Sequence, residues 1–130
     1  MLRVRDPAVA VPWYEKHLGM RLVCRRDFAD FSLYFIGSFA PGAPLPPEDA
    51  TSEAAWEFAC SVSTTLIELT HNHGTESQAG FTYHNGNTEP RGFGHLAFLV
   101  RFASHWVLKR HTCEVSASIL YFTATYRAAD

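Results

Sequence analysis

The sequence predicts an α+β domain in which a mostly antiparallel sheet accompanies one early helix. Two observations favour this fold class. A helical pattern near the amino terminus is followed by a run of strand-like segments, and runs of strands after a single helix are typical of α+β proteins. The 130 residues are also enough for one domain with its own hydrophobic core. The expected order is strand, helix, three strands, a long loop and one further strand.

The first two elements differ in their hydrophobic period. Residues 1–4 form a short apolar run that predicts a strand, and residues 5–20 have a helical pattern. Asp6 and Pro7 are a helix-start signal, and Gly19 is a typical stop. The apolar residues that share one face of this helix are Val11, Tyr14 and Leu18.

Further strands are expected where apolar, aromatic and β-branched residues alternate or cluster. These segments are residues 21–28, 31–39, 61–72 and 95–100. Two loops separate them. The proline-rich residues 40–53 suit neither a helix nor a central strand. The polar residues 74–94 contain an Asn-Gly pair at 85–86, which is typical of a tight turn.

Composition excludes several classes of function. The net charge is −2 and no basic block is present, so we expect no nucleic-acid partner. The apolar runs are far shorter than the roughly 20 residues that span a bilayer, and the first residues resemble no signal or transit peptide. The three cysteines, Cys24, Cys60 and Cys113, predict free buried thiols in a reducing compartment, so we expect a cytoplasmic protein without membrane contact.

Two residues are candidate metal ligands. Glu68 shares a strand face with Leu66 and Thr70, and spacing alone favours a face open to solvent, because burying an unpaired carboxylate is costly. His95 begins an apolar strand, where a lone histidine is more often structural than a ligand. A carboxylate and an imidazole together suit zinc, nickel, iron or manganese, although two ligands leave a site incomplete.

Three further residues are candidate substrate contacts: Arg3, Asn72 and Arg91. Arg91 lies between Pro90 and a Gly-Phe-Gly turn, so its side chain could reach into a cleft. Guanidinium groups bind carboxylates with two parallel hydrogen bonds. The alternative for each arginine is a solvated surface charge, and the residues alone favour that alternative.

Several sequence blocks resemble the glyoxalase I, or lactoylglutathione lyase, family. They are MLRVRDP, YEKHLGM, FSLYFIG, IELTHNHGTES and YHNGNTEPRGFGH, and the similarity extends from Met1 to about Val100. The last two blocks are the most specific. This resemblance, and not composition or periodicity, carries the implications that follow.

The resemblance implies the vicinal oxygen chelate fold, which is built from paired βαβββ modules with curved, mostly antiparallel sheets. This chain would supply one module and the first strand of a second. Residues 1–100 are therefore expected to form an incomplete glyoxalase domain, and residues 101–130 a divergent tail. The family also forms homodimers whose sites take ligands from both chains, so a homodimer is expected.

The family converts the hemithioacetal of methylglyoxal and glutathione into S-lactoylglutathione, which detoxifies methylglyoxal. The resemblance assigns Glu68 and His95 to one zinc or nickel ion, and Arg3, Asn72 and Arg91 to glutathione. The family's other two ligands, a glutamine and a proton-shuttling glutamate, belong to blocks that this sequence does not contain. No catalytic residue is thus retained with certainty, although Glu68 is a candidate, and we expect little or no lyase activity from these 130 residues.

A second class of function remains open. A non-catalytic vicinal oxygen chelate domain would bind a glutathione-like ligand or a protein partner without a metal. An iron-dependent ring-cleaving dioxygenase is a third alternative, which Glu68 disfavours because it matches a lyase glutamate. Metal content separates the first two classes, since stoichiometric zinc or nickel favours the lyase.

Overall fold

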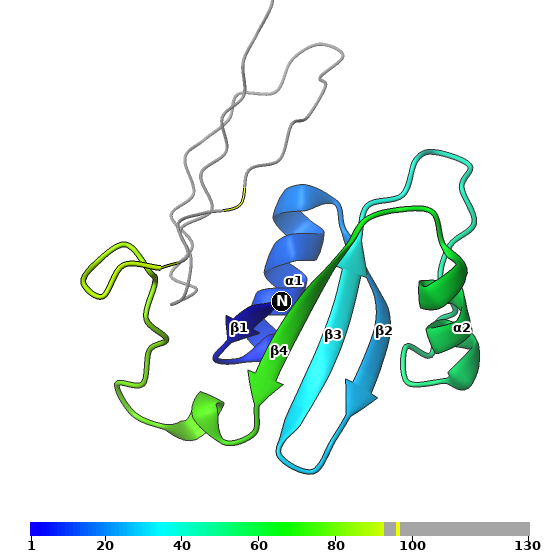
Figure 1. Cartoon of the computed structure of the whole chain (residues 1–130). Coiled ribbons are helices and arrows are strands. Elements are labelled where there is room, and N and C mark those ends of the chain that lie inside the picture. The colour runs from blue at the N-terminus through cyan, green and yellow to red at the C-terminus, as the bar shows by residue number, and fades with distance from the viewer. Residues whose placement is uncertain (93–95, 97–130) are drawn as a thin grey trace, which may run out of the picture. The chain divides into compact units, whose positions relative to one another are not determined.

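The computed structural model describes residues 1–92 and 96. The chain divides into two units, with the boundary between Tyr83 and His84. Each unit is described by itself. All the described helices and strands lie in the first unit (Figure 1). The strand expected at 95–100, most of the predicted second module and the tail at 101–130 fall outside the described residues.

The first unit is built on a four-stranded mixed sheet. Its strands are β1 (Leu2–Val4), β2 (Arg21–Asp27), β3 (Phe31–Gly37) and β4 (Leu66–Asn72), in the spatial order β1-β4-β3-β2. β1 is parallel to β4, whereas β4 pairs with β3, and β3 with β2, in antiparallel fashion. The predicted α+β class with a mostly antiparallel sheet is confirmed.

Helix α1 (Pro7–Leu18) begins and ends at the predicted signals. The Asp6 side chain accepts a hydrogen bond of 2.8 Å from the backbone N–H of Ala8, which satisfies one of the free donors in the first turn. At the other end Gly19 adopts a left-handed conformation with φ of 61°, which costs glycine little. Val11 and Tyr14 of the predicted face are buried, and Figure 1 shows the helix on one face of the sheet.

A second helix, α2 (Glu53–Ser61), replaces part of the expected loop and strand. The expected uninterrupted run of strands is therefore wrong at this point, and β4 begins at Leu66 instead of residue 61. The helix has local signals, since the Ser52 hydroxyl accepts from the N–H of Ala55 at 3.2 Å. Its nine residues bury Ala55 completely, and Trp56, Phe58 and Ala59 pack beside it. The sequence analysis assigned no element to residues 54–60.

The alternation of β-strand side chains gives the sheet two different faces. One face carries the fully buried Val4, Ile36 and Leu69. On the opposite face α2 packs beside β2, where Trp56 and neighbouring apolar residues of the helix contact Cys24 and Phe35. The part of that face beyond the contacts of α2 is called the site face below; its residues are Arg3, Phe31, Leu33, Glu68, Thr70 and Asn72.

The cysteines agree only in part with the prediction of free buried thiols. Cys24 is free and buried, and desolvation raises the pKa of its thiol. Cys60 is free but exposed, because it lies on the outer side of α2. Cys113 lies outside the described residues. No described helix is long and apolar enough to cross a membrane.

Replacement of Leu69 by alanine should destabilise the first unit, because this side chain is completely buried on β4. Large-to-small substitutions in a core remove buried area and leave a cavity, so we expect a loss of about 2–5 kcal/mol in the free energy of unfolding. The matched control is Leu45→Ala, whose side chain is 53% exposed. Urea unfolding monitored by circular dichroism checks this. Equal midpoints for the two variants would contradict the packing.

Candidate functional site

The pairing of β1 with β4 brings two of the predicted substrate contacts together. Arg3 lies opposite Thr70 in the parallel ladder, and its Nη1 donates a hydrogen bond of 3.0 Å to Oδ1 of Asn72. These two residues are 69 positions apart in the sequence. Because Oδ1 is used as the acceptor, the amide NH₂ of Asn72 and further guanidinium N–H groups of Arg3 can donate to a ligand. Such a set of donors suits a carboxylate.

Glu68 lies on the same face, four residues before Asn72 on β4. At about 3.4 Å per residue the two backbones are about 14 Å apart along the strand. Glu68 lies opposite Phe35 of β3 and is half-buried. The residue is therefore neither fully open to solvent nor fully enclosed, the two alternatives that the sequence left open. The Glu68 carboxylate and the Arg3–Asn72 pair of donors therefore lie at two separate points on the site face.

Thr70 lies between these two points. The residue is only 4% exposed, and its hydroxyl has no hydrogen-bond partner among the residues that the structure describes. Buried polar atoms normally have a partner in folded proteins. The hydroxyl oxygen is also shielded from solvent, so it offers no contact to a ligand on the site face.

The described residues do not form a complete metal site by themselves. Residues 1–92 and 96 contain no group of three His, Cys, Asp or Glu side chains that could hold a metal ion. Of the two predicted ligands only Glu68 is described, and its oxygen atoms suit a divalent cation. His95 lies outside the described residues, so its role as a ligand stays a prediction.

The opposite face of the sheet carries a polar network that the sequence analysis missed. The hydroxyl of Ser32 donates to Oδ1 of Asp27 at 2.5 Å, and Nε2 of His73 lies 2.8 Å from the same hydroxyl oxygen. Since the serine proton points at the aspartate, the histidine nitrogen is the donor to the serine. In a nucleophilic triad the histidine instead lies between the other two and takes the serine's proton.

This order rules out an activated nucleophile, and Ser32 is only 1% exposed. The network is structural. The hydrogen bond from Ser32, together with the nearby Arg25, lowers the pKa of Asp27. On the same face Nε2 of His71 lies 2.7 Å from the Glu76 carboxylate, which has a lowered pKa because of backbone hydrogen bonds and this histidine.

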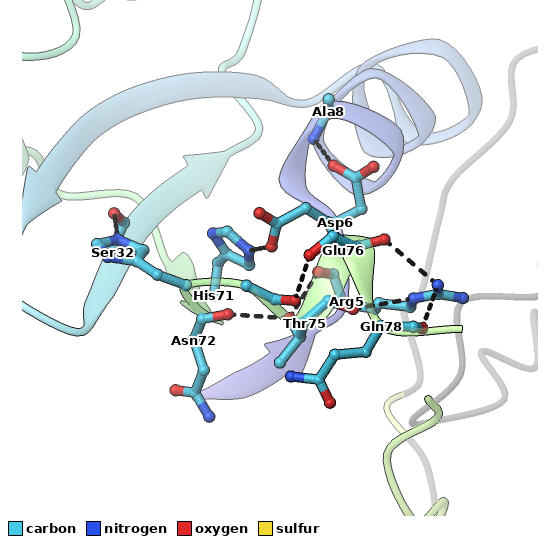
Figure 2. Close-up of polar contacts among 12 residues, drawn as sticks. Arg5, Asp6, Ala8, Ser32, His71, Asn72, Thr75, Glu76 and Gln78 are labelled. Atoms are coloured by element: carbon cyan, nitrogen blue, oxygen red, sulfur yellow. Dashed lines mark hydrogen bonds and ion pairs between the residues drawn. The ribbon is translucent and has the colours of Figure 1, made fainter. Parts of the chain in front are cut away.

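The turn that follows β4 is tied to the residues after β1. This turn contains the short 3₁₀ helix η1 (Thr75–Ser77). The Arg5 guanidinium donates to three of its carbonyl oxygens, from Nε to Thr75 at 3.2 Å and from Nη2 to Glu76 and Gln78 at 3.3 and 2.7 Å. Figure 2 shows the guanidinium with its dashed contacts to the turn. The sequence analysis did not select Arg5, although it lies within the specific MLRVRDP block.

The remaining predicted contact belongs to the second unit. Arg91 is exposed, and its Nε lies 3.0 Å from the carboxylate of Glu89, which is also exposed. At the predicted turn, Gly86 has a φ of 78° and the Asn85 side chain accepts a hydrogen bond from the N–H of Asn87 at 2.9 Å, within a stretch of bends at residues 86–90. Whether Arg91 joins Arg3 and Asn72 in one site stays a prediction.

Comparison with known proteins assigns the family. Residues 1–118 match the model of the Glyoxalase/Bleomycin resistance protein/Dioxygenase superfamily. The chain belongs to this superfamily. The resemblance to glyoxalase drawn from the sequence blocks is thereby confirmed at the level of the family.

Individual members of the superfamily give a consistent result. Lactoylglutathione lyase of Pseudomonas putida is 48% identical over 102 residues, which cover 77% of this chain and 56% of that protein. Glyoxalase I of Saccharomyces cerevisiae is 43% identical over 102 residues, covering 76% of this chain and 29% of the yeast protein. The chain thus spans about half the length of the bacterial relative and less than a third of the yeast one.

Among solved structures, the glyoxalase I of Leishmania major, described as trypanothione-dependent, matches with a TM-score of 0.48 and 25% identity. The match covers 77% of this chain and 52% of that one. The assignment to the glyoxalase superfamily rests on the sequence matches.

The network behind the sheet predicts a pH-dependent contribution to stability. The pKa of Asp27 is lower in the folded protein, so its ionised form stabilises the fold above the unfolded pKa of about 3.9, and this stabilisation is lost as pH falls through the folded value. Asp27→Asn should lower the free energy of unfolding at neutral pH. Because the side chain is 48% exposed, the loss should stay below about 1 kcal/mol.

Urea unfolding between neutral pH and about pH 3 measures this difference, which should shrink in acid. Asp30→Asn is the matched control, since its side chain has no hydrogen bond within the described part of the hairpin. A difference for Asp27→Asn that stays constant at all pH values would contradict the assignment.

Proposed function

We propose that this chain is the glutathione-binding part of a lactoylglutathione lyase, which converts the methylglyoxal–glutathione hemithioacetal into S-lactoylglutathione. The observation that carries the proposal is the Arg3–Asn72 pair on the same sheet face as Glu68. The relatives named lactoylglutathione lyase support the reaction class, a carbon–sulfur lyase. The cytoplasm, where glutathione is abundant, is the compartment that we propose for it.

In this proposal Arg3 and Asn72 bind a carboxylate of the glutathione part. Both side chains have donors left after their mutual hydrogen bond, and a charge-assisted interaction with a carboxylate would use them. Arg91 is proposed as a third contact to the same part of the substrate. Its exposed guanidinium is held only by Glu89 within the described residues, and a substrate carboxylate could replace that surface ion pair.

The reacting end of the substrate would lie near Glu68. An extended tripeptide spans about 10 Å, and the γ-glutamyl link of glutathione lengthens it further. This length is comparable with the spacing of about 14 Å between Asn72 and Glu68 along β4. A ligand anchored at Asn72 could thus lie along β4 and present its sulfur end to Glu68.

Glu68 and His95 are the metal ligands that we propose, and a homodimer is the proposed assembly. A zinc or nickel ion would supply Lewis acidity to the substrate oxygens. The half-buried position of Glu68 next to Phe35 supports its role, because a partly desolvated carboxylate binds a cation more strongly than one in water. The alternative is a non-catalytic domain that binds a glutathione-like ligand without metal, and the Arg3–Asn72 pair is compatible with it.

Removal of either side chain that donates hydrogen bonds to the glutathione carboxylate should weaken glutathione binding. Arg3→Met keeps the apolar stem and Asn72→Leu keeps the branched shape, but both remove hydrogen bonds to a charged group, so we expect the dissociation constant to rise about 10- to 100-fold. Arg21→Met is the matched control, because Arg21 is an exposed arginine on β2 at the far edge of the sheet. Isothermal titration calorimetry with glutathione measures all four proteins. Equal affinities for Arg3→Met and Arg21→Met would refute the binding role.

Metal content separates the lyase from the binding domain. The purified chain, loaded with zinc or nickel and dialysed, should retain metal in an amount that Glu68→Gln reduces. Glu57→Gln, which changes an exposed carboxylate of α2, should leave the metal content unchanged. Elemental analysis gives the content, and loss of the hemithioacetal measures turnover, which we expect to be small. Glutathione binding with no retained metal would favour the non-catalytic domain, and turnover near that of a full-length relative would contradict the expected low activity.

A further inference from the structure

The substrate-binding Asn72 lies at a weak point of the sheet. The β1–β4 ladder ends with the pair Val4–His71, so Asn72 is one residue beyond the last residue that pairs with β1. On the other side it still lies opposite Phe31 of β3. Strand ends fray when one side of the ladder is missing, because backbone groups there open at little cost. Something else must therefore hold Asn72 at a fixed distance from Arg3.

The side chain of Thr75 occupies this position. Its hydroxyl oxygen lies 2.9 Å from the carbonyl oxygen of Asn72 and 2.8 Å from that of Arg5, and can donate its proton to either. Thr75 is only 5% exposed, so water does not compete strongly for these contacts. The hydroxyl thus links the backbone after β1 to the last residue of β4.

The Arg5 side chain completes the link from the other direction. Its guanidinium donates to the carbonyl oxygens of Thr75, Glu76 and Gln78, and Figure 2 shows these contacts around one cation. Thr75 therefore bonds to the backbone of Arg5 while Arg5 bonds to the backbone of Thr75. We call this reciprocal arrangement of the two side chains the clasp. Hydrogen bonds from a charged donor are stronger than neutral ones, which favours a rigid turn.

We propose that Arg5 and Thr75 are positioning residues for the Arg3–Asn72 pair. The clasp holds the backbone of Asn72, which carries one ligand donor, and that of Arg5, which lies two residues after the other donor, Arg3. It thereby maintains the 3.0 Å contact between Arg3 and Asn72. This inference rests on the proposed binding of a glutathione carboxylate. A misplacement of about 1 Å in a binding group can cost up to about 100-fold in function.

The experiment compares two substitutions of Thr75 in the full 130-residue chain. Thr75→Val keeps the shape but removes the hydroxyl, whereas Thr75→Ser keeps the hydroxyl. Ser77→Ala is the control, because it removes a hydroxyl from the same turn that bonds only to Gly74 within the described residues, at 2.9 Å. Arg5→Ala tests the other half of the clasp. Each protein is examined by calorimetry with glutathione, by its urea midpoint, and by the NMR signals of the Asn72 side-chain amide without ligand.

We expect Thr75→Val and Arg5→Ala to weaken glutathione binding about tenfold and to shift or broaden the Asn72 amide signals. Thr75→Ser should restore wild-type affinity and signals, and Ser77→Ala should change neither. Wild-type affinity for Thr75→Val would overturn the proposal. So would equal losses of affinity in Thr75→Val and Thr75→Ser, or losses that follow the urea midpoint in every variant including Ser77→Ala.

Failure of the proposed function has a different result. If the wild-type chain binds no glutathione, that function is refuted, and the Asn72 amide signals alone decide the fate of the clasp. Altered signals in Thr75→Val, with normal signals in Thr75→Ser, would support a positioning role for whichever ligand the pair binds. Unchanged signals in Thr75→Val would refute the clasp as well.

Discussion

The parallel pairing of β1 with β4 is the constraint on which the candidate site depends. Three residues, Leu2–Val4, form this ladder, yet it connects the first residues of the chain to Leu69–His71. Without this pairing Arg3 would have no fixed position relative to Asn72. The site face would then keep Glu68 but lose the pair of hydrogen-bond donors proposed for the ligand. A short parallel strand gains little from its own hydrogen bonds. Its position is secured by the buried Val4 below and by the contacts of Arg5 beyond its end.

The two faces of the sheet divide structural and functional tasks. Behind the sheet lie α1, the apolar core and the hydrogen-bonded network of Asp27, Ser32 and His73. On the other face, α2 packs over the region near Cys24 and Phe35, and Glu68 and Asn72, which lie further from the helix, are half-buried. A one-residue change in the register of β4 would exchange these two sets of side chains, since neighbouring residues point to opposite faces. The register of β4 therefore determines which side chains form the site face.

The sequence predicted what depends on local signals and on the specific blocks. Helix α1 has a capping aspartate and a terminal glycine, and both act over a few residues. Helix α2 was missed although Ser52 caps it and Ala55, Trp56 and Ala59 give it an apolar side, because it is only nine residues long and follows a proline-rich loop directly. The contact between Arg3 and Asn72 depends on a ladder between distant segments, which spacing alone does not encode. Their selection came from resemblance, and Arg5 and Thr75 escaped notice because their contacts are made to backbone atoms.

The two borders of the sheet are not equivalent. At the β2 border, the N–H of Arg25 already donates to the carbonyl of Ala50 in the loop before α2, at 2.7 Å. The outer side of β1 has no strand partner within the described part of the chain. Exposed strand borders are templates on which another chain can add a strand. A strand added at the β1 border would lie beside Arg3 and would therefore also border the site face.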